Sequence, residues 1–93
     1  MMRKIEKAMV VAVCQHHKWK SGNTAVVPID DTNVAVYLHG NEIATVNSNT
    51  GFLMVNNATL SRWSTPTTKS RLRALGANVY TSKHVTYLDG VAV

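Results

Sequence analysis

The chain has 93 residues, of which 45% are hydrophobic and only 16% are charged, with a net charge of +5. This length supports one hydrophobic core and excludes two, so we expect a single domain over residues 1–93. The lone cysteine, Cys14, excludes an intramolecular disulfide and fits a reducing cytoplasm, and no apolar stretch reaches the roughly 18 residues that favour a membrane span.

The first predicted element is an amphipathic helix over residues 3–17. One arc of about 100° on a helical wheel holds the side chains of Ile5, Met9, Ala12, Val13 and His16. A buried strand over residues 9–13 is the competing interpretation, because β-branched residues favour strands. The charged residues that precede this run do not fit a strand. Residues 18–23 then predict a turn.

From residue 24 onward, short β-branched runs alternate with turn residues. The predicted strands cover residues 24–29, 33–38, 42–47 and 52–55. The reversal at residues 39–41 suits positive φ, which Gly40 adopts freely and Asn41 tolerates. Because reversals follow one another without a helix between them, the pattern predicts an antiparallel meander of three to four strands.

A second helix is predicted over residues 66–75. Thr65 is a favourable N-cap, Pro66 suits the first helical position, and Gly76 suits the C-terminal end. Beyond it a short β tail is expected over residues 79–81, 85–88 and 91–93. The expected fold is therefore α+β, with an N-terminal helix, the meander, the second helix and the β tail, and with the helices on one face of the sheet.

Six apolar residues are expected in the core: Val36, Leu38, Ile43, Val46, Leu72 and Leu75. Trp19 and Trp63 stand at a turn and at a helix entrance, where a tryptophan either covers the core or forms a binding surface. Small size and sparse charge also favour a homo-oligomer, assembled through an edge strand or through the apolar face of residues 3–17.

Positive charge is concentrated at both ends of the chain. Residues 1–20 carry five Lys and Arg against Glu6, residues 21–60 carry three acids and no Lys or Arg, and residues 61–93 carry five cations against Asp89. This layout favours an anionic partner. The predicted nucleic-acid-binding residues lie near the start of the second helix, whose N-terminus can itself accept a phosphate; they are Arg62, Trp63, Lys69, Arg71, Arg73 and Lys83.

Helical geometry gives this basic set a second interpretation. At about 100° per residue, Lys69 and Arg73 share one side of the helix, whereas Arg71 lies roughly 160° from Arg73. Solvated flanks of an amphipathic helix have the same pattern. The alternative function is a protein-binding module, such as an inhibitor or modulator of a host factor, which needs only a surface patch and an edge strand. A minor structural or assembly component is the third hypothesis.

The sequence contains no pattern typical of catalysis or of a metal site. Cys14, His16 and His17 are neighbours, but zinc sites usually present two spaced clusters of ligands. Cys14 has no recognisable partner motif for nucleophilic catalysis, and Asp30-Asp31 fits a turn better than an acid/base pair. We therefore expect a protein that is not an enzyme and that uses neither a cofactor nor a metal.

Three blocks of the sequence, over roughly residues 22–75, resemble a recurring family. They are Gly22-Asn23-Thr24, Val36-Tyr37-Leu38-His39-Gly40-Asn41-x-Ile43-Ala44 and Trp63-x-Thr65-x-Thr67-Thr68-Lys69-Ser70-Arg71-Leu72-x-Ala74-Leu75. The family comprises small uncharacterised proteins of short-tailed lytic bacteriophages. Pro66 departs from its pattern, and so does the tail after Gly76. The resemblance implies a phage product that acts in the host bacterial cytoplasm, and it leaves the biochemical act open.

Folding accounts for most residues of these blocks. Gly40 fits a tight turn, Thr65 and Thr67 can cap a helix, and Leu72 and Leu75 supply a packing face. Lys69, Ser70 and Arg71 are not needed for folding in this interpretation. They are therefore the residues expected to serve a function.

Overall fold

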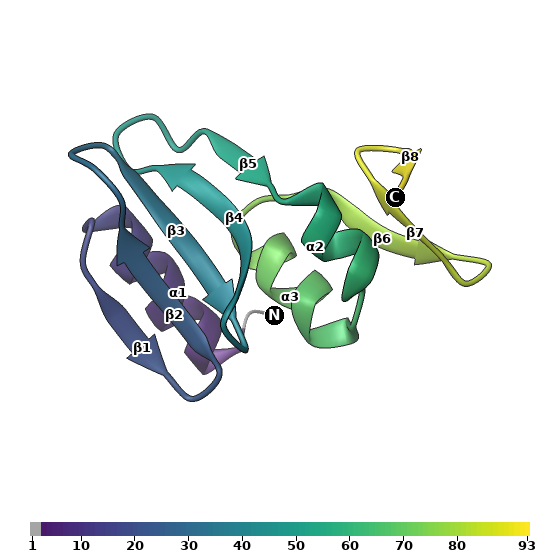
Figure 1. The fold of residues 1–93 in the computed structure, drawn as a ribbon, viewed down its shortest axis with the longest axis horizontal. Helices are drawn as coiled ribbons and strands as arrows, with labels where there is room; N and C mark the ends of the chain where they lie inside the picture. Colours follow the sequence, from purple (N-terminus) through teal and green to yellow (C-terminus); the bar gives the residue numbers. More distant parts are fainter. Residues whose placement is uncertain (1–2) are drawn as a thin grey trace.

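Two antiparallel sheets and three helices make up residues 3–93, the part of the chain that the computed structural model describes (Figure 1). The helices are α1 (Lys4–Cys14), α2 (Asn57–Arg62) and α3 (Pro66–Ala74). The larger sheet is a meander of β1 (Trp19–Ser21), β2 (Thr24–Pro28), β3 (Asn33–Leu38), β4 (Asn41–Asn47) and β5 (Leu53–Val55). The smaller sheet contains β6 (Val79–Ser82), β7 (Val85–Leu88) and β8 (Val91–Ala92). The α+β fold predicted from the sequence is confirmed.

The predicted helical arc of α1 packs against one face of the larger sheet (Figure 1) and buries Met9, Ala12 and Val13. The helix ends earlier than predicted because His16 adopts a positive φ of 57°. The backbone N–H groups of His16 and His17 then donate to the carbonyls of Val13 and Ala12, which closes the helix. Since this face is covered within the chain, it is not free for the predicted contact between copies.

The larger sheet has one more strand than expected, because the turn predicted over residues 18–23 contains β1. Trp19, Lys20 and Ser21 pair with Val26, Ala25 and Thr24 of β2. The reversal needs only Gly22 and Asn23, with Gly22 at a φ of 56°. A two-residue loop with a glycine at its first position joins antiparallel strands without splaying them, so residues on its N-terminal side are free to pair.

A β-bulge interrupts the pairing of β3 with β4. Val36 pairs with Ala44 and Tyr37 pairs with Glu42, so Ile43 is the extra residue. The bulge resets the alternation of side chains, and the adjacent residues Ile43 and Ala44 are both buried. In the preceding turn the positive φ angles belong to His39 (52°) and Gly40 (80°), so the expectation for Asn41 was wrong.

The helix α2 was missed by the sequence analysis. Its N-cap is Asn56, whose side-chain oxygen accepts a hydrogen bond of 3.0 Å from the backbone N–H of Thr59. The helix has six residues and buries only Leu60. One buried side chain in six residues gives no hydrophobic period that a sequence pattern could reveal.

The prediction for α3 is confirmed at both ends. The Thr65 hydroxyl accepts from the backbone N–H of Thr68 at 3.1 Å, Pro66 begins the helix, and Gly76 follows it with a φ of 106°. Five of the six predicted core residues are buried, and Leu75 is partly buried against the same cluster. Trp19 also packs partly against the core, whereas Trp63 is 48% exposed.

The turn between β6 and β7 is a strained point in the fold. Lys83 and His84 form its two central residues, with φ angles of 48° and 66°. Non-glycine residues pay about 1 kcal/mol or more in this left-handed region. Replacing the pair by Asn and Gly (Lys83→Asn/His84→Gly) should therefore stabilise the hairpin by about 1 kcal/mol.

Amide hydrogen exchange of β6 and β7 would measure this gain locally, and urea unfolding would measure it globally. The variant Lys83→Asn/His84→Ala serves as the control, because it makes the same charge change without relieving the second residue. Equal protection of the hairpin in the two variants would contradict the strain argument.

Candidate binding site

A buried ion pair joins α1 to α3 and removes one predicted site residue from the surface. The Arg71 guanidinium lies 2.8 Å from the Glu6 carboxylate, and both side chains are buried. Arg71 also donates to the Thr24 hydroxyl of β2 at 3.1 Å, and the Ser70 hydroxyl donates to Glu6. The expectation that Ser70 and Arg71 are dispensable for folding was therefore wrong.

Burial and hydrogen bonding act on Glu6 in opposite directions. Burial by itself would raise the pKa of the Glu6 carboxyl. Hydrogen bonds from Ser70, from the Arg3 backbone N–H and from Arg71, together with the positive charge of Arg71, outweigh burial and hold the pKa below its ordinary value of 4.5. The carboxylate is therefore ionised in the folded protein at neutral pH, as the ion pair requires.

Lys69 and Arg73 hold the C-terminal sheet against α3. The Lys69 ammonium group donates to the Thr81 hydroxyl, and the Arg73 guanidinium donates to the Val79 carbonyl at 3.1 Å. Their common side of the helix, predicted from the spacing, thus faces β6. Lys69 was expected to be free for function, but its side chain has this structural contact as well.

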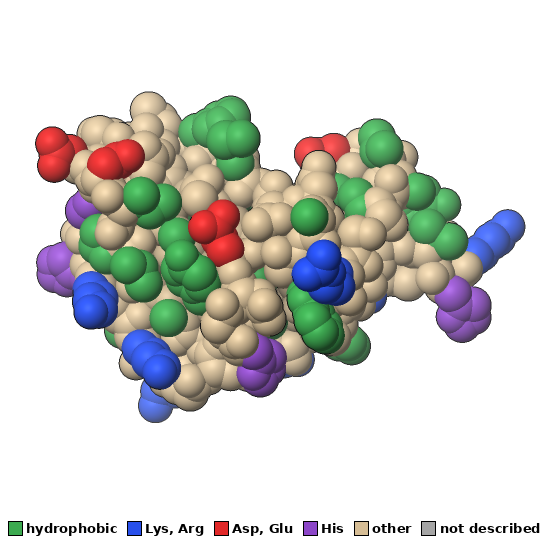
Figure 2. Space-filling view, viewed as in Figure 1, with side chains coloured by type: hydrophobic (Ala, Val, Ile, Leu, Met, Phe, Trp, Pro, Cys, Tyr) green, Lys and Arg blue, Asp and Glu red, His purple; other side chains and the backbone are tan. Residues whose placement is uncertain are grey.

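The structure does not gather the six predicted nucleic-acid-binding residues into one patch. Arg71 is buried, Lys69 and Arg73 contact β6, and Lys83 lies at the exposed turn of the β6–β7 hairpin. Arg62 and Trp63 remain exposed at the end of α2. On the face shown in Figure 2, Lys and Arg side chains are scattered over the surface instead of clustered.

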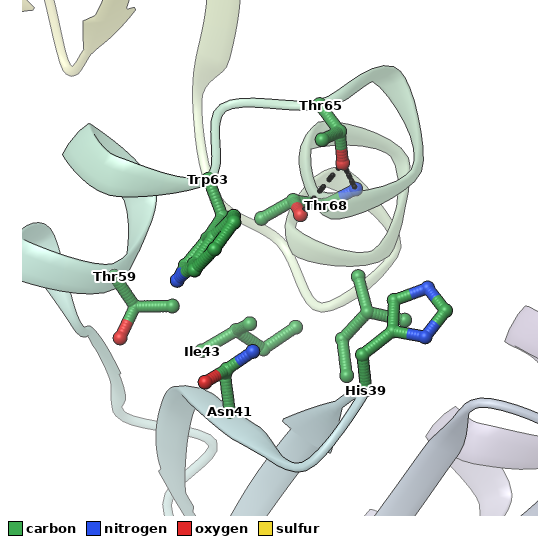
Figure 3. A pocket seen from close by; sticks show the side chains of 8 residues that line it. His39, Asn41, Ile43, Thr59, Trp63, Thr65 and Thr68 are labelled. Carbon is green, nitrogen blue, oxygen red and sulfur yellow. Dashed lines mark hydrogen bonds between the residues drawn. The ribbon is translucent and has the colours of Figure 1, made fainter.

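An uncharged pocket of about 240 Å³ lies beside Trp63. Its lining includes the buried side chains of Leu38 and Ile43. Figure 3 shows Ile43 at the floor, with hydroxyl, amide, imidazole and indole groups around it. Figure 3 shows the Trp63 and His39 rings on opposite sides of the pocket, with the indole N–H edge toward Thr59. The lining residues are Leu38, His39, Asn41, Ile43, Thr59, Trp63, Thr65 and Thr68.

Three segments far apart in the sequence build this pocket. The β3–β4 turn supplies His39, the first residue of β4 supplies Asn41, and the bulge directs Ile43 to the interior. The end of α2 supplies Trp63, which follows the last helical residue. The N-cap of α3 supplies Thr65, whose hydroxyl is held at 2.9 Å from that of Thr68. The second and third blocks of the resemblance therefore meet at this pocket.

Of the predicted site residues, only Trp63 lines the pocket. His39 and Asn41 were assigned to a turn, Thr65 to a cap, and Leu38 and Ile43 to the core; the remaining two lining residues, Thr59 and Thr68, were given no role. The adjacent apolar pair Ile43-Ala44 in a predicted strand was the available sign of a bulge, because strict alternation would place one of them outside. Nothing in the sequence showed that Trp63 would face the β3–β4 turn, since that contact depends on where α2 packs.

Arg71→Ala should strongly destabilise the fold. It leaves the Glu6 carboxylate buried without its cation, a loss that typically costs about 3–5 kcal/mol. Arg73→Ala is the matched control, because this exposed arginine lies two residues along α3 and loses a single hydrogen bond worth about 1 kcal/mol. Urea unfolding of both variants gives the comparison, and similar losses for the two would contradict a structural role specific to Arg71.

The free energy of unfolding should also decrease in acid, because Glu6 becomes protonated. Because its pKa is lower in the folded state, its contribution is complete above the ordinary value of 4.5 and is lost as pH falls through the folded-state pKa. Glu6→Gln should lack this dependence. The difference in unfolding free energy between the wild type and the variant should therefore shrink between about pH 6 and about pH 3.

Asp30 does not confuse this measurement. Hydrogen bonds from the Thr32 backbone N–H and from Asn33 lower its pKa to about 2, but Asp30 is present in both proteins and cancels in the difference. A constant difference across the acid range would show that Glu6 does not titrate as proposed.

No helix in the described part of the chain is long and apolar enough to cross a membrane. Among residues 3–93, no group of three or more His, Cys, Asp or Glu side chains is placed to hold a metal ion.

Comparison with known proteins identifies the family. The family model described as Kyanoviridae Gp96 protein matches residues 2–92. No curated protein and no solved structure matches the chain. The phage origin implied by the resemblance is confirmed, whereas a specific link to short-tailed lytic phages stays a prediction. The chain belongs to the Kyanoviridae Gp96 protein family, a family of phage proteins.

Proposed function

We propose that this phage protein is a non-enzymatic binding protein that recognises another protein through the pocket beside Trp63. The observation that carries the proposal is an open pocket with an apolar floor, an exposed tryptophan and no Asp, Glu, Lys or Arg in its lining. Protein interfaces place their strongest contacts in such pockets, and tryptophan is enriched among them. A host factor that the phage inhibits or modulates is the partner class we favour.

The volume of the pocket fits one side chain of a partner. Apolar cavities of about 150 Å³ accommodate benzene, so about 240 Å³ accepts a single aromatic or large aliphatic side chain. Contact with Leu38 and Ile43 would stabilise the inserted group through apolar burial, while Asn41 and Thr59 offer hydrogen bonds at the rim. This combination suits a hydrophobic anchor flanked by polar backbone.

Nucleic acid binding through the basic helix receives less support from the geometry. A protein that binds the phosphate backbone of a nucleic acid needs several Lys or Arg side chains that contact phosphates at the same time. Arg71 is buried, and Lys69 and Arg73 already contact the C-terminal sheet. A single-stranded nucleic acid is the alternative partner, because the exposed Trp63 could stack on a base while the neighbouring Arg62 contacts a phosphate.

Trp63→Ala should weaken partner binding about 30-fold or more without unfolding the chain. Truncation of a central tryptophan commonly costs about 2 kcal/mol or more, which raises Kd roughly 30-fold. Phe52→Ala is the matched control, because Phe52 is an exposed aromatic residue outside the pocket, at 65% exposure. The measurement is capture of the partner from host lysate with and without nuclease, followed by titration of the identified partner with each variant.

Capture that resists nuclease and is lost with Trp63→Ala supports the proposal. If both variants lose the partner equally, or if neither variant loses it, the pocket does not mediate the interaction. Gel shifts with single-stranded DNA and RNA at two salt concentrations test the alternative. Binding that weakens with salt and depends on Trp63 and Arg62 would replace the protein partner with nucleic acid.

A further inference from the structure

The second face of the five-stranded sheet has no helix over it within residues 3–93. The side chains of Val26 and Val36 point inward and are buried, so their neighbours along β2 and β3, which are Ala25, Val27, Ala35 and Tyr37, point toward the other face. Figure 2 shows this outer face, where hydrophobic side chains gather over β2 and β3. The surface is therefore apolar at its centre, in contrast to the polar outer face of an ordinary half-buried sheet.

The strand register arranges the outward residues in cross-strand rows. One row consists of Lys20, Ala25, Tyr37 and Glu42, which lie on β1, β2, β3 and β4 in that order. In the next row, Val27 of β2 lies opposite Ala35 of β3. Each row thus sets a larger apolar side chain beside an alanine, and the first row ends in opposite charges.

We propose that this outer face binds a second copy of the chain. The two copies would be related by a two-fold axis that runs along the strands between β2 and β3. Such an axis exchanges β2 with β3 and β1 with β4. A surface can pair with itself in this way only if it is self-complementary across the axis, and the first row has that property in shape and in charge.

The complementarity in shape rests on Ala25. The axis brings Tyr37 of the second copy over Ala25, which borders an open hollow. It also brings Val27 of the second copy over Ala35, whose side chain is already covered within the chain, so Ala35 offers a flat contact. An open hollow of about 540 Å³ already lies on this face, bounded by Lys20, Ala25, Val27 and Tyr37 among others. The dimer therefore has two such hollows, one in each copy, and the Tyr37 ring of the other copy enters each of them.

The complementarity in charge rests on Lys20 and Glu42. They stand three strand spacings apart, or about 14 Å, which is too far for an ion pair within one chain. The same axis places Lys20 over Glu42 of the second copy, and the reverse. Two ion pairs thus flank an apolar centre, which is the usual arrangement of an interface, and the sheets pack about 10 Å apart with their strands within about 30°.

Charge-reversal variants distinguish the proposed dimer from a dimer that forms through another surface. Lys20→Glu and Glu42→Lys should each weaken the dimer about tenfold or more, because each change sets two like-charged pairs across the interface. The double variant Lys20→Glu/Glu42→Lys should restore it. An equimolar mixture of the two single variants should also restore it, since opposite charges then face each other at both positions.

Lys83→Glu is the matched control, because it makes the same charge change at an exposed turn away from this face. Sedimentation equilibrium gives the dimer Kd, and far-UV circular dichroism shows that each variant is folded. Ala25→Trp adds a test without charge, because it fills the hollow and should also abolish the dimer.

The expected result is a wild-type dimer, two weakened single variants, and recovery in the double variant and in the mixture. A wild-type monomer at about 100 µM would overturn the proposal. A dimer whose Kd is unaffected by the single reversals and by Ala25→Trp would equally overturn it, because another surface would then mediate assembly.

Discussion

The buried ion pair between the Glu6 carboxylate and the Arg71 guanidinium joins the N-terminal helix α1 to α3. Two charges removed from water are tolerated only when each is paired and its remaining hydrogen-bonding groups are satisfied. Glu6 accepts from Arg3, Ser70 and Arg71, while Arg71 also reaches Thr24. The network therefore fixes α1, α3 and β2 relative to one another, across a sequence separation of 65 residues between the paired charges.

A second polar contact holds the opposite end of α1. The Ser48 hydroxyl, in the loop after β4, donates to the Val13 carbonyl at 3.1 Å and lies 3.0 Å from the His16 imidazole. With both ends held, Met9, Ala12 and Val13 are directed onto one face of the sheet. The other face is left open, and the surface that we propose for the contact between copies follows from this asymmetry.

The placement of α3 by Arg71 also determines the candidate pocket. Thr65 and Thr68 lie at the start of α3, where they face the β3–β4 turn. The bulge at Ile43 contributes the floor, and Trp63 closes the opposite side. The pocket therefore depends on the ion pair through the position of one helix. Loss of the pair should disturb binding as well as stability, whereas substitution of Trp63 should disturb binding alone.

The sequence by itself determined the local elements. The apolar arc of residues 5–16, the Thr65-Pro66 helix start, Gly76 and the successive turn residues each have a physical meaning within a few positions. The helices α1 and α3, the strands β2 to β5 and the β tail follow from them, whereas α2 and β1 do not. Only the tertiary structure decided which polar residues were structural. On a helical wheel, Arg71 lies beside the apolar face, which is where solvent-exposed charged residues usually lie. The wheel does not show that Arg71 contacts the Glu6 carboxylate, 65 positions away in the sequence. The pocket and the open sheet face were hidden for the same reason: they are made by contacts between distant segments, and no local pattern encodes those contacts.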